Sequence, residues 1–320
     1  MWRYAFKFAS PGGTRGRLSI LIFHRVLAET DPLFPGEPNA AQFDKLCAHL
    51  RARFEVLPLS EAVTRLQQGS LPAGALAITF DDGYADNLSI AAPILRKHHL
   101  PATLFIATGY LDGGCMWNDK LIEAFRSTRN SEIDLRDLGL ETYSVESIAA
   151  RRAGIDRVID ATKYLSLAER DARADHVLRA AGATAPKKLM LDSTSVNTLA
   201  SLGVDVGVHT VNHPILARTS SDQAWEEIVE SKRRLEELTG KSMRLFAYPN
   251  GKPGQDYSRE HVSMVQQAGF DAAVSTAWGP ATRQSDIFQL PRFTPWAREP
   301  FKFDLLMMRN LRMTAEQHAA

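Results

Sequence analysis

The sequence predicts an α/β fold in which parallel strands alternate with crossover helices, as a barrel or as an open doubly wound sheet. Apolar runs of strand length alternate with segments whose apolar residues recur at helical spacing along most of the 320 residues. In addition, Gly240 and Gly269 each follow a helical segment and precede a strand, which is where helices commonly end. Such alternation is typical of parallel strands that place their ligand sites at their carboxyl ends.

The first third of the chain contains three expected strands and three expected helices. Uninterrupted apolar runs predict the strands, and apolar residues every three or four positions predict the helices. In chain order, the elements are a strand at 18–23, helices at 43–54 and 60–69, a strand at 75–80, a helix at 87–98 and a strand at 102–107. A loop rich in proline and glycine at 31–38 separates the first strand from the first helix.

The later part of the chain repeats the pattern after an interruption. The expected elements are strands at 204–208, 244–248, 272–275 and 289–293, with helices at 222–238 and 257–268. Between 117 and 198 the sequence is charged and mostly helical, with helices at 151–164 and 167–181 and no expected strand pair. We therefore expect one catalytic domain: barrel residues of about 18–116 and 199–296, a helical insertion at about 117–198 that caps the site or contacts a partner, and a C-terminal tail at 297–320.

Composition excludes several classes of protein. The apolar fraction of 44% and the charged fraction of 23% are ordinary for a globular protein. A formal net charge of +1 provides no electrostatic footprint for nucleic acid. Cys47 and Cys115 are too few for a disulfide framework and lack metal-ligand spacing, so we expect buried free thiols.

No segment predicts membrane insertion or export. Residues 1–16 contain no apolar run of signal-peptide length, and no stretch approaches the ~18 apolar residues that span a bilayer. We therefore expect a soluble, cytoplasmic protein. Peripheral membrane contact is the alternative for two aromatic, basic stretches, the first made by Trp2, Tyr4, Phe6, Lys7 and Phe8 and the second by 301–313, although ordinary packing against the body is favoured.

Two short motifs follow apolar strands. Asp81 and Asp82 end the strand at 75–80, and Gly83 allows a tight turn there; the alternative is ordinary turn chemistry. His209 and His213, four residues apart, follow the strand at 204–208, so that both rings can face one point; alone, they would more often be surface or capping histidines. Together the motifs supply two nitrogen ligands and one oxygen ligand for a divalent metal, with one carboxylate left as a base.

These motifs resemble those of the polysaccharide deacetylases, the NodB-homology group of carbohydrate esterase family 4. The resemblance rests on Thr-Phe-Asp-Asp-Gly at 79–83 and His-Thr-x-x-His at 209–213, on their order, on the strand at 102–107 and on Phe-Ala-Tyr-Pro-Asn-Gly at 246–251. It extends from residue 18 to about 296, apart from the insertion. It implies a distorted (β/α) barrel with a metal site at its mouth.

The resemblance also implies roles for individual residues. Asp81 would be the base, and Asp82, His209 and His213 would hold a divalent metal. Zinc is the expected ion because two imidazoles and a carboxylate suit it, with Co²⁺, Ni²⁺ and Mn²⁺ as alternatives. A backbone N–H in the turn from Tyr248 to Gly251, that of Asn250 by analogy, would hold the oxyanion.

The sequence departs from the family pattern in two places. The usual Arg-x-Pro-Tyr motif has no arginine here, and Arg292 could replace it from a neighbouring strand; the alternative is a surface salt bridge. A late histidine that would protonate the leaving amine is also missing. His24, at the end of the first strand, is the best substitute, against a structural role for His24 or return of the proton by Asp81 itself.

The leading hypothesis is metal-dependent removal of an N-acetyl or O-acetyl group from a sugar of a surface polysaccharide or its precursor. The expected partner is thus an acetylated carbohydrate. One alternative is a hydrolase of a small amide or imide on the same fold. Another is a glycan-binding protein with a degenerate site, because the usual arginine and late histidine are absent.

Overall fold

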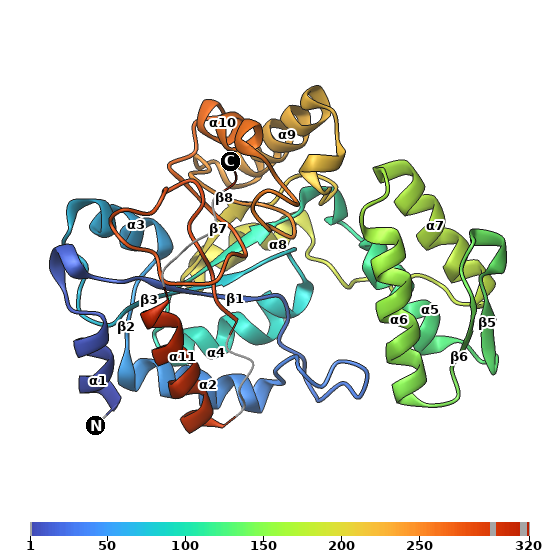
Figure 1. Cartoon of the computed structure of the whole chain (residues 1–320), viewed down its shortest axis with the longest axis horizontal. Helices are drawn as coiled ribbons and strands as arrows, with labels where there is room; N and C mark the ends of the chain where they lie inside the picture. The colour runs from blue at the N-terminus through green and yellow to red at the C-terminus, as the bar shows by residue number, and fades with distance from the viewer. Residues whose placement is uncertain (1, 295–298, 314–318, 320) are drawn as a thin grey trace.

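The computed structural model of the chain describes residues 2–294, 299–313 and 319, apart from the side chains of residues 2 and 3. Its main element is a curled parallel sheet of seven strands in the order β1-β3-β4-β7-β8-β9, with β2 also paired to β3 (Figure 1). These strands are β1 (Ser19–Phe23), β2 (Glu55–Val56), β3 (Ala75–Phe80), β4 (Ala102–Ile106), β7 (Val204–Val208), β8 (Leu245–Ala247) and β9 (Ala272–Val274). The predicted parallel α/β architecture is confirmed.

An irregular segment joins the first and last strands of this order, β1 and β9. The strand predicted at 289–293 is not a regular strand, because only single bridges form there: Leu290 pairs with Val274 of β9, and Phe293 pairs with Leu21 of β1. The Phe293 N–H donates to the Ile20 carbonyl at 2.8 Å, and the Ser275 N–H donates to the Leu290 carbonyl at 2.8 Å. Proline at 291, between the bridges, has no N–H to continue a ladder. The result is a distorted (β/α) barrel, as predicted.

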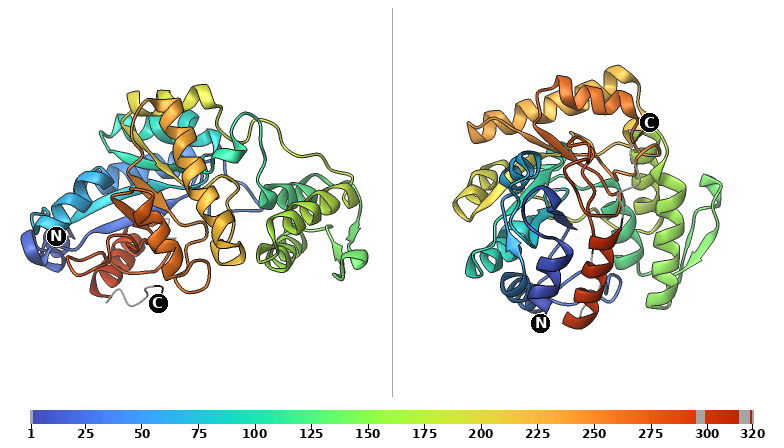
Figure 2. Two further views of the ribbon diagram at one scale, coloured as in Figure 1. Left: turned by 90° about the horizontal axis from the view of Figure 1, so that it is seen from above. Right: turned by 60° about the vertical axis from the view of Figure 1, so that its left-hand side comes forward.

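Helices cover the outer face of the sheet (Figures 1 and 2). They are α2 (Ala40–Arg53), α3 (Leu59–Gln68), α4 (Ala92–Lys97), α8 (Ser193–Ser201), α9 (Ser221–Thr239) and α10 (Arg259–Gln267). Local chemistry sets their ends: Asn39 and Gln42 form a capping box at the start of α2, and Gly240 ends α9 in a left-handed conformation. The helix predicted at 87–98 begins as a π-helical turn, Asn87–Ala91, before α4.

Two terminal helices lie side by side against the barrel, at the lower left of Figure 1 and again in the right-hand view of Figure 2. They are α1 (Trp2–Ala9), which the sequence did not predict as a helix, and α11 (Pro300–Arg312). Buried Asp304 ties α11 to α2 through His49 at 2.7 Å and Arg53 at 3.1 Å. Among the helices that the structure describes, none has the length and apolar character needed to cross a membrane.

The region expected to be an insertion lies on the side of the barrel away from α1 and α11 (Figure 1). It contains α5 (Trp117–Ser127), α6 (Ile148–Lys163) and α7 (Leu167–Ala180), packed around a separate apolar cluster that includes Phe125 and Val158. The expectation of no strand pair is wrong, since β5 (Glu132–Asp134) and β6 (Thr142–Ser144) form a short antiparallel pair. The domain boundaries stay a prediction, and the one near 296 lies outside the described residues.

The inside of the barrel is filled by one alternating set of strand residues. Small alanines such as Ala77, Ala247 and Ala272 surround the ring of Phe105, whereas the other strand faces pack beneath the helices. Gly207, beside Phe105 on the neighbouring strand, leaves room for that ring: a Cβ at position 207 would lie 2.4 Å from the Phe105 side chain. Strand β7 therefore needs glycine at this position.

We expect Gly207→Ala to lower the free energy of unfolding by about 1–3 kcal/mol, because the added methyl group overpacks the barrel interior. Urea denaturation followed by circular dichroism measures this difference. Asp205→Ala on the same strand is the control, since that side chain is exposed and its removal causes no clash. Equal unfolding midpoints for the Gly207 variant and the wild type would contradict the packing argument.

Candidate metal centre

Five strand ends meet at one cavity of about 340 Å³. Because the strands are parallel, the residues that follow them lie at the same edge of the sheet. Those that line the cavity are His24 after β1, Asp81 and Asp82 after β3, His209 and His213 after β7, Asn250 after β8, and Thr276 after β9. The structure thus brings together seven residues that are far apart in the sequence.

The insertion supplies the opposite wall of this cavity. Trp117 and Asn118 at the start of α5, and Ile159 and Lys163 near the end of α6, line it together with Met116. Neighbouring Asp119 is buried and accepts a hydrogen bond from the Tyr84 hydroxyl at 3.2 Å, so it does not line the cavity. The insertion therefore narrows the mouth, although its apolar core is separate.

Asp82, His209 and His213 form a group able to hold a metal ion. Their candidate ligand atoms lie within 4.8 Å of one another, and all three residues are buried. The Oδ1 atom of Asp82 is 3.5 Å from Nε2 of His209 and 3.4 Å from Nε2 of His213. Two ring nitrogens and one carboxylate oxygen converge, which is the donor set of many zinc sites.

A buried polar atom without a hydrogen-bond partner supports the fit of this site to a cation. Oδ1 of Asp82, the atom between the two imidazoles, is buried and has no hydrogen-bond partner among the described residues. A buried polar atom without a partner normally costs about 1–3 kcal/mol, so such an atom needs an explanation. A divalent ion bound by Asp82, His209 and His213 would satisfy this oxygen.

Hydrogen bonding orients the first imidazole. Nδ1 of His209 lies 2.7 Å from the Ala247 carbonyl oxygen and donates to it, which leaves Nε2 as the nitrogen that faces Asp82. Burial alone would lower the pKa of His209, but the charges of Asp81 and Asp82 raise it above its ordinary value. Burial lowers the pKa of His213 to about 3. Metal ligation requires both imidazoles in their neutral form.

The second carboxylate has a different partner. Both oxygens of Asp81 accept hydrogen bonds from the guanidinium of Arg292 at 2.6 Å, a bidentate pair. Arg292 is 1% exposed and also donates to the Ser275 carbonyl and the Thr79 hydroxyl. Burial would raise the pKa of Asp81, but the charges of Arg292 and His209 keep it below its ordinary value. The alternative of a surface salt bridge for Arg292 is therefore wrong.

Two charged side chains hold the loop that carries His213. Glu227 of α9 accepts from the N–H groups of Val211 and Asn212 at 2.9 and 2.7 Å. Arg170 of α7 is 2% exposed and donates to the carbonyls of Asn212 and His213 at 3.0 and 2.9 Å. His213 itself has a positive φ of 50°, a conformation that such contacts must maintain. Through Arg170, the insertion fixes the backbone of a candidate ligand.

Two further predicted residues, His24 and Tyr248, differ in their position relative to the cavity. His24 is exposed and lines the mouth, as expected of a group that meets substrate. Tyr248, predicted as a substrate or oxyanion residue, is 0% exposed; its ring stacks on Tyr257, its hydroxyl donates to the Phe288 carbonyl, and its N–H donates to the Val274 carbonyl. The structure thus corrects that prediction and places Tyr248 in the core.

The turn after Tyr248 leaves one N–H for an oxyanion. Proline 249 has none, and the N–H of Gly251 donates to the Pro249 carbonyl at 2.6 Å. Asn250 has a φ of 58° and lines the cavity, and the Thr276 hydroxyl donates to its carbonyl at 2.6 Å. Asn250 therefore stays the predicted oxyanion position in this turn.

Sequence reasoning missed Lys163, Arg170 and Glu227. Each occupies an ordinary position on an amphipathic helix, and its partner is far away in the chain, so no local pattern distinguishes it. The structure also places Trp117 and Asn118, at the start of the insertion, on the cavity wall. Tertiary placement, not local sequence, reveals these contributions.

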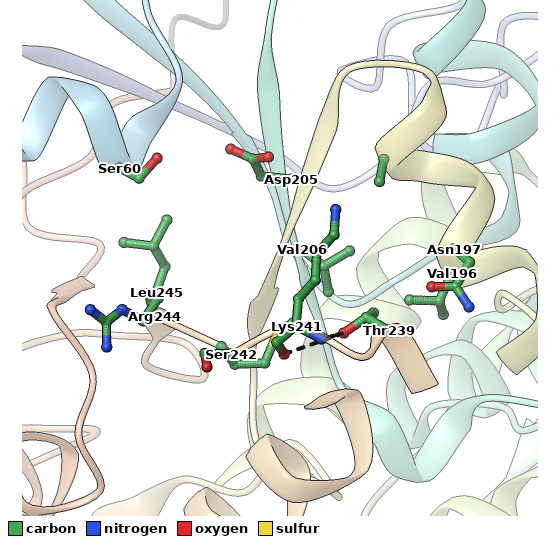
Figure 3. Close-up of a pocket in the computed structure, with 12 residues that line it drawn as sticks. Ser60, Val196, Asn197, Asp205, Val206, Thr239, Lys241, Ser242, Arg244 and Leu245 are labelled. Atoms are coloured by element: carbon green, nitrogen blue, oxygen red, sulfur yellow. Dashed lines mark hydrogen bonds between the residues drawn. The ribbon is translucent and has the colours of Figure 1, made fainter. Parts of the chain in front are cut away.

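Another hollow lies at the opposite end of the sheet, around the amino ends of β7 and β8 (Figure 3). The labelled side chains include one carboxylate, that of Asp205, and two cationic groups, those of Lys241 and Arg244. It contains neither paired carboxylates nor imidazoles. The candidate chemistry therefore remains at the carboxyl ends of the strands.

Comparisons with known proteins identify the family of the chain. The family model described as polysaccharide deacetylase matches residues 68–136 and 166–273, more than half of the chain. The Bacillus subtilis (strain 168) protein YxkH, whose name proposes a polysaccharide deacetylase, is 20% identical over 277 residues, 86% of this chain and 70% of its own length. The poly-beta-1,6-N-acetyl-D-glucosamine N-deacetylase of Staphylococcus epidermidis is 27% identical over 139 residues, 43% of this chain and 46% of that protein.

A solved structure shares the fold. Streptococcus pyogenes deacetylase PplD, in complex with acetate, superposes with a TM-score of 0.61 at 19% identity. The superposition covers 91% of this chain and 97% of the other. At this level of identity the likeness shows the fold alone.

We expect Arg292→Met to lower the free energy of unfolding at neutral pH by about 3–5 kcal/mol, because it leaves a buried carboxylate unpaired. The depressed pKa of Asp81 stabilises the wild type above the ordinary aspartate pKa, and this stabilisation disappears as the pH falls through the native-state value. The difference between variant and wild type should therefore shrink as the pH falls. Chemical denaturation across a pH series measures it, with Arg259→Met, at an exposed surface pair, as the control.

We expect Arg170→Ala to weaken zinc binding by about tenfold or more, because groups that orient a ligand commonly contribute 10- to 100-fold. Isothermal titration of zinc into the metal-free protein measures this affinity. Arg173→Ala on the same helix is the matched control, since Arg173 donates to the Ala161 carbonyl of α6 and not to the histidine loop. Equal zinc affinities for both variants would show that α7 does not position the ligand loop.

Proposed function

The chain belongs to the polysaccharide deacetylase family, whose members are hydrolases of carbon–nitrogen bonds other than peptide bonds, and from that premise we propose that it is a metal-dependent deacetylase of an N-acetylated sugar. The observation that carries the proposal is the pairing of two adjacent carboxylates with different partners. Asp82 faces two imidazoles, and Asp81 is held by a buried arginine. One carboxylate is thus available as a ligand, and the other as a base.

The proposed ligands are Asp82, His209 and His213, and zinc is the expected ion because two imidazoles and a carboxylate suit it. Bound there, a divalent ion would acidify water and polarise the acetyl carbonyl. Three protein ligands leave a coordination position for this purpose, as in catalytic zinc sites. Co²⁺, Ni²⁺ and Mn²⁺ remain alternatives.

Asp81 is the proposed base. Its bidentate pairing with Arg292 keeps the carboxylate ionised at neutral pH and fixes its orientation at the cavity wall. It would take a proton from water as the oxygen attacks the acetyl carbon. The Asn250 N–H would stabilise the negative charge that develops on the carbonyl oxygen.

The amine leaving group needs a proton before it departs. His24 is the proposed donor because it is the exposed histidine of the mouth, whereas His209 and His213 are the proposed metal ligands. Return of the proton by Asp81 is the alternative. His24→Gln separates the two, since only a donor role for His24 makes its loss lower the rate of acetate release.

We infer an N-acetylated hexosamine unit of a surface polysaccharide, or of its precursor, as the substrate. The support is the name of the Staphylococcus epidermidis relative, which acts on a polymer of N-acetyl-D-glucosamine. The cavity of about 340 Å³, lined by Trp117, Asn118 and Lys163 as well as by the metal group, combines apolar and polar contacts as sugar sites do.

We expect Asp81→Asn, loaded with zinc, to release acetate from N-acetylglucosamine oligomers at least about 10²-fold more slowly than the wild type, because the base is lost. Its zinc affinity should stay close to that of the wild type, since the three ligands remain. Asp82→Asn should instead lose zinc affinity as well as activity. Acetate assay and zinc titration on the same samples distinguish the two carboxylates.

Two outcomes would contradict this assignment. If Asp81→Asn retains the wild-type rate of acetate release, Asp81 is not the base. If the zinc-loaded wild type binds the oligomers and releases no acetate from them, the chain is a glycan-binding protein on a deacetylase fold.

A further inference from the structure

The exposed apolar side chains of this protein are concentrated on two adjacent helices. Seven large hydrophobic residues are exposed within the described part of the chain, and four of them, Tyr4, Phe8, Phe301 and Leu305, belong to α1 and α11. These helices have 8 and 13 residues, a small fraction of the chain. Chance scatter over the surface does not explain such a concentration.

Each helix has a packed face and an exposed face. On α1, Phe6 is buried, whereas Tyr4 and Phe8, four residues apart, are 78% and 90% exposed. On α11, the buried side is made by Phe303, Met307 and Leu311. Residues four apart lie on the same side of a helix, so Phe301 and Leu305, 61% and 47% exposed, form one stripe. The expectation of ordinary packing thus holds for one face of each helix and not for the other.

The charge on the outward face is positive. Lys7, Lys302, Arg309 and Arg312 are exposed on α1 and α11, and the one acidic residue within these helices, Asp304, is buried between His49 and Arg53. Glu299, just before α11, pairs with Lys302 at 3.3 Å. Cations beside aromatic and aliphatic side chains complement an anionic lipid surface, where apolar groups enter the headgroup region and cations meet phosphates.

The start of α11 lies beside a cavity that adjoins the metal cavity. Pro300, the first residue of α11, lines a cavity of about 480 Å³ together with Leu46 of α2, Ile22 and His24. Ile22 and His24 also line the metal cavity.

We propose that the face formed by α1 and α11, with Tyr4, Phe8 and Leu305 between Lys7, Lys302, Arg309 and Arg312, docks the protein on an anionic lipid bilayer. The apolar side chains provide most of the binding free energy, and the cations select anionic lipid. The docking does not depend on the deacetylase reaction, so an experiment can refute the membrane proposal and leave the proposed function intact, or the reverse.

Co-sedimentation of the full chain with vesicles tests the proposal. One set of vesicles contains phosphatidylcholine alone, and the other contains equal parts of phosphatidylcholine and phosphatidylglycerol. The wild type should bind the anionic vesicles, and added salt should weaken this binding because it screens the cations. Phe8→Ser combined with Leu305→Ser should reduce binding about tenfold or more, since both substitutions remove apolar surface that would be buried in the bilayer.

A charge variant tests the contribution of the cations, and a control variant tests whether any exposed apolar residue would have the same effect. Lys302→Glu combined with Arg309→Glu should abolish the preference for anionic vesicles. Ile148→Ser, which removes an exposed apolar residue from the insertion, is the matched control and should bind as the wild type does. All of these side chains are exposed, so acetate release from soluble oligomers should be unchanged in every variant.

Three results would overturn the proposal. The wild type could fail to bind either kind of vesicle. The Phe8 and Leu305 variant could bind as tightly as the wild type. Finally, sedimentation velocity could show a concentration-dependent dimer that this variant abolishes, in which case the face is an interface between two copies of the chain.

Discussion

The site depends on the buried ion pair between Asp81 and Arg292. It joins residues 211 positions apart, one at the end of β3 and the other in the irregular segment that links β9 to β1. Removal of a guanidinium and a carboxylate from water costs several kcal/mol per ion, and two hydrogen bonds of 2.6 Å with further donation to Ser275 and Thr79 offset that cost. The ion pair therefore joins the irregular segment to the end of β3 and, at the same time, fixes the orientation of Asp81.

This pairing explains how two neighbouring aspartates can differ in chemistry. Both oxygens of Asp81 accept hydrogen bonds from Arg292. The guanidinium therefore holds this carboxylate, and Asp82 is the one that can bind a metal ion. Asp82 has a left-handed backbone conformation, with φ of 77°, which turns its side chain toward His209 and His213 instead. The strain at Asp82 is a local cost that a bound cation would offset.

Much of this arrangement was accessible from the sequence. Asp81, Asp82, His209 and His213 belong to short motifs directly after apolar runs, and parallel strands place such ends together regardless of the intervening chain. The strand expected at 289–293 became two bridges around a proline, and α1, which has only eight residues, was not predicted as a helix. The pair β5 and β6 has three residues per strand, too few for a recognisable alternation. Tyr248 was placed in the site by its neighbours in the sequence, but the turn directs its ring into the core.

The insertion shows why the rest of the site could not be predicted. Most of its apolar residues specify that helices α5 to α7 pack on one another, and that requirement says nothing about where the unit lies relative to the barrel. The placement depends on contacts with residues far away in the chain, among them the buried Arg170, which donates to the Asn212 and His213 carbonyls. The same placement brings Ile159 and Lys163 to the cavity. A segment that is remote in sequence from both motifs thus shapes the mouth and holds a candidate ligand, so changes in the insertion can alter the shape of the mouth while the four motif residues stay the same.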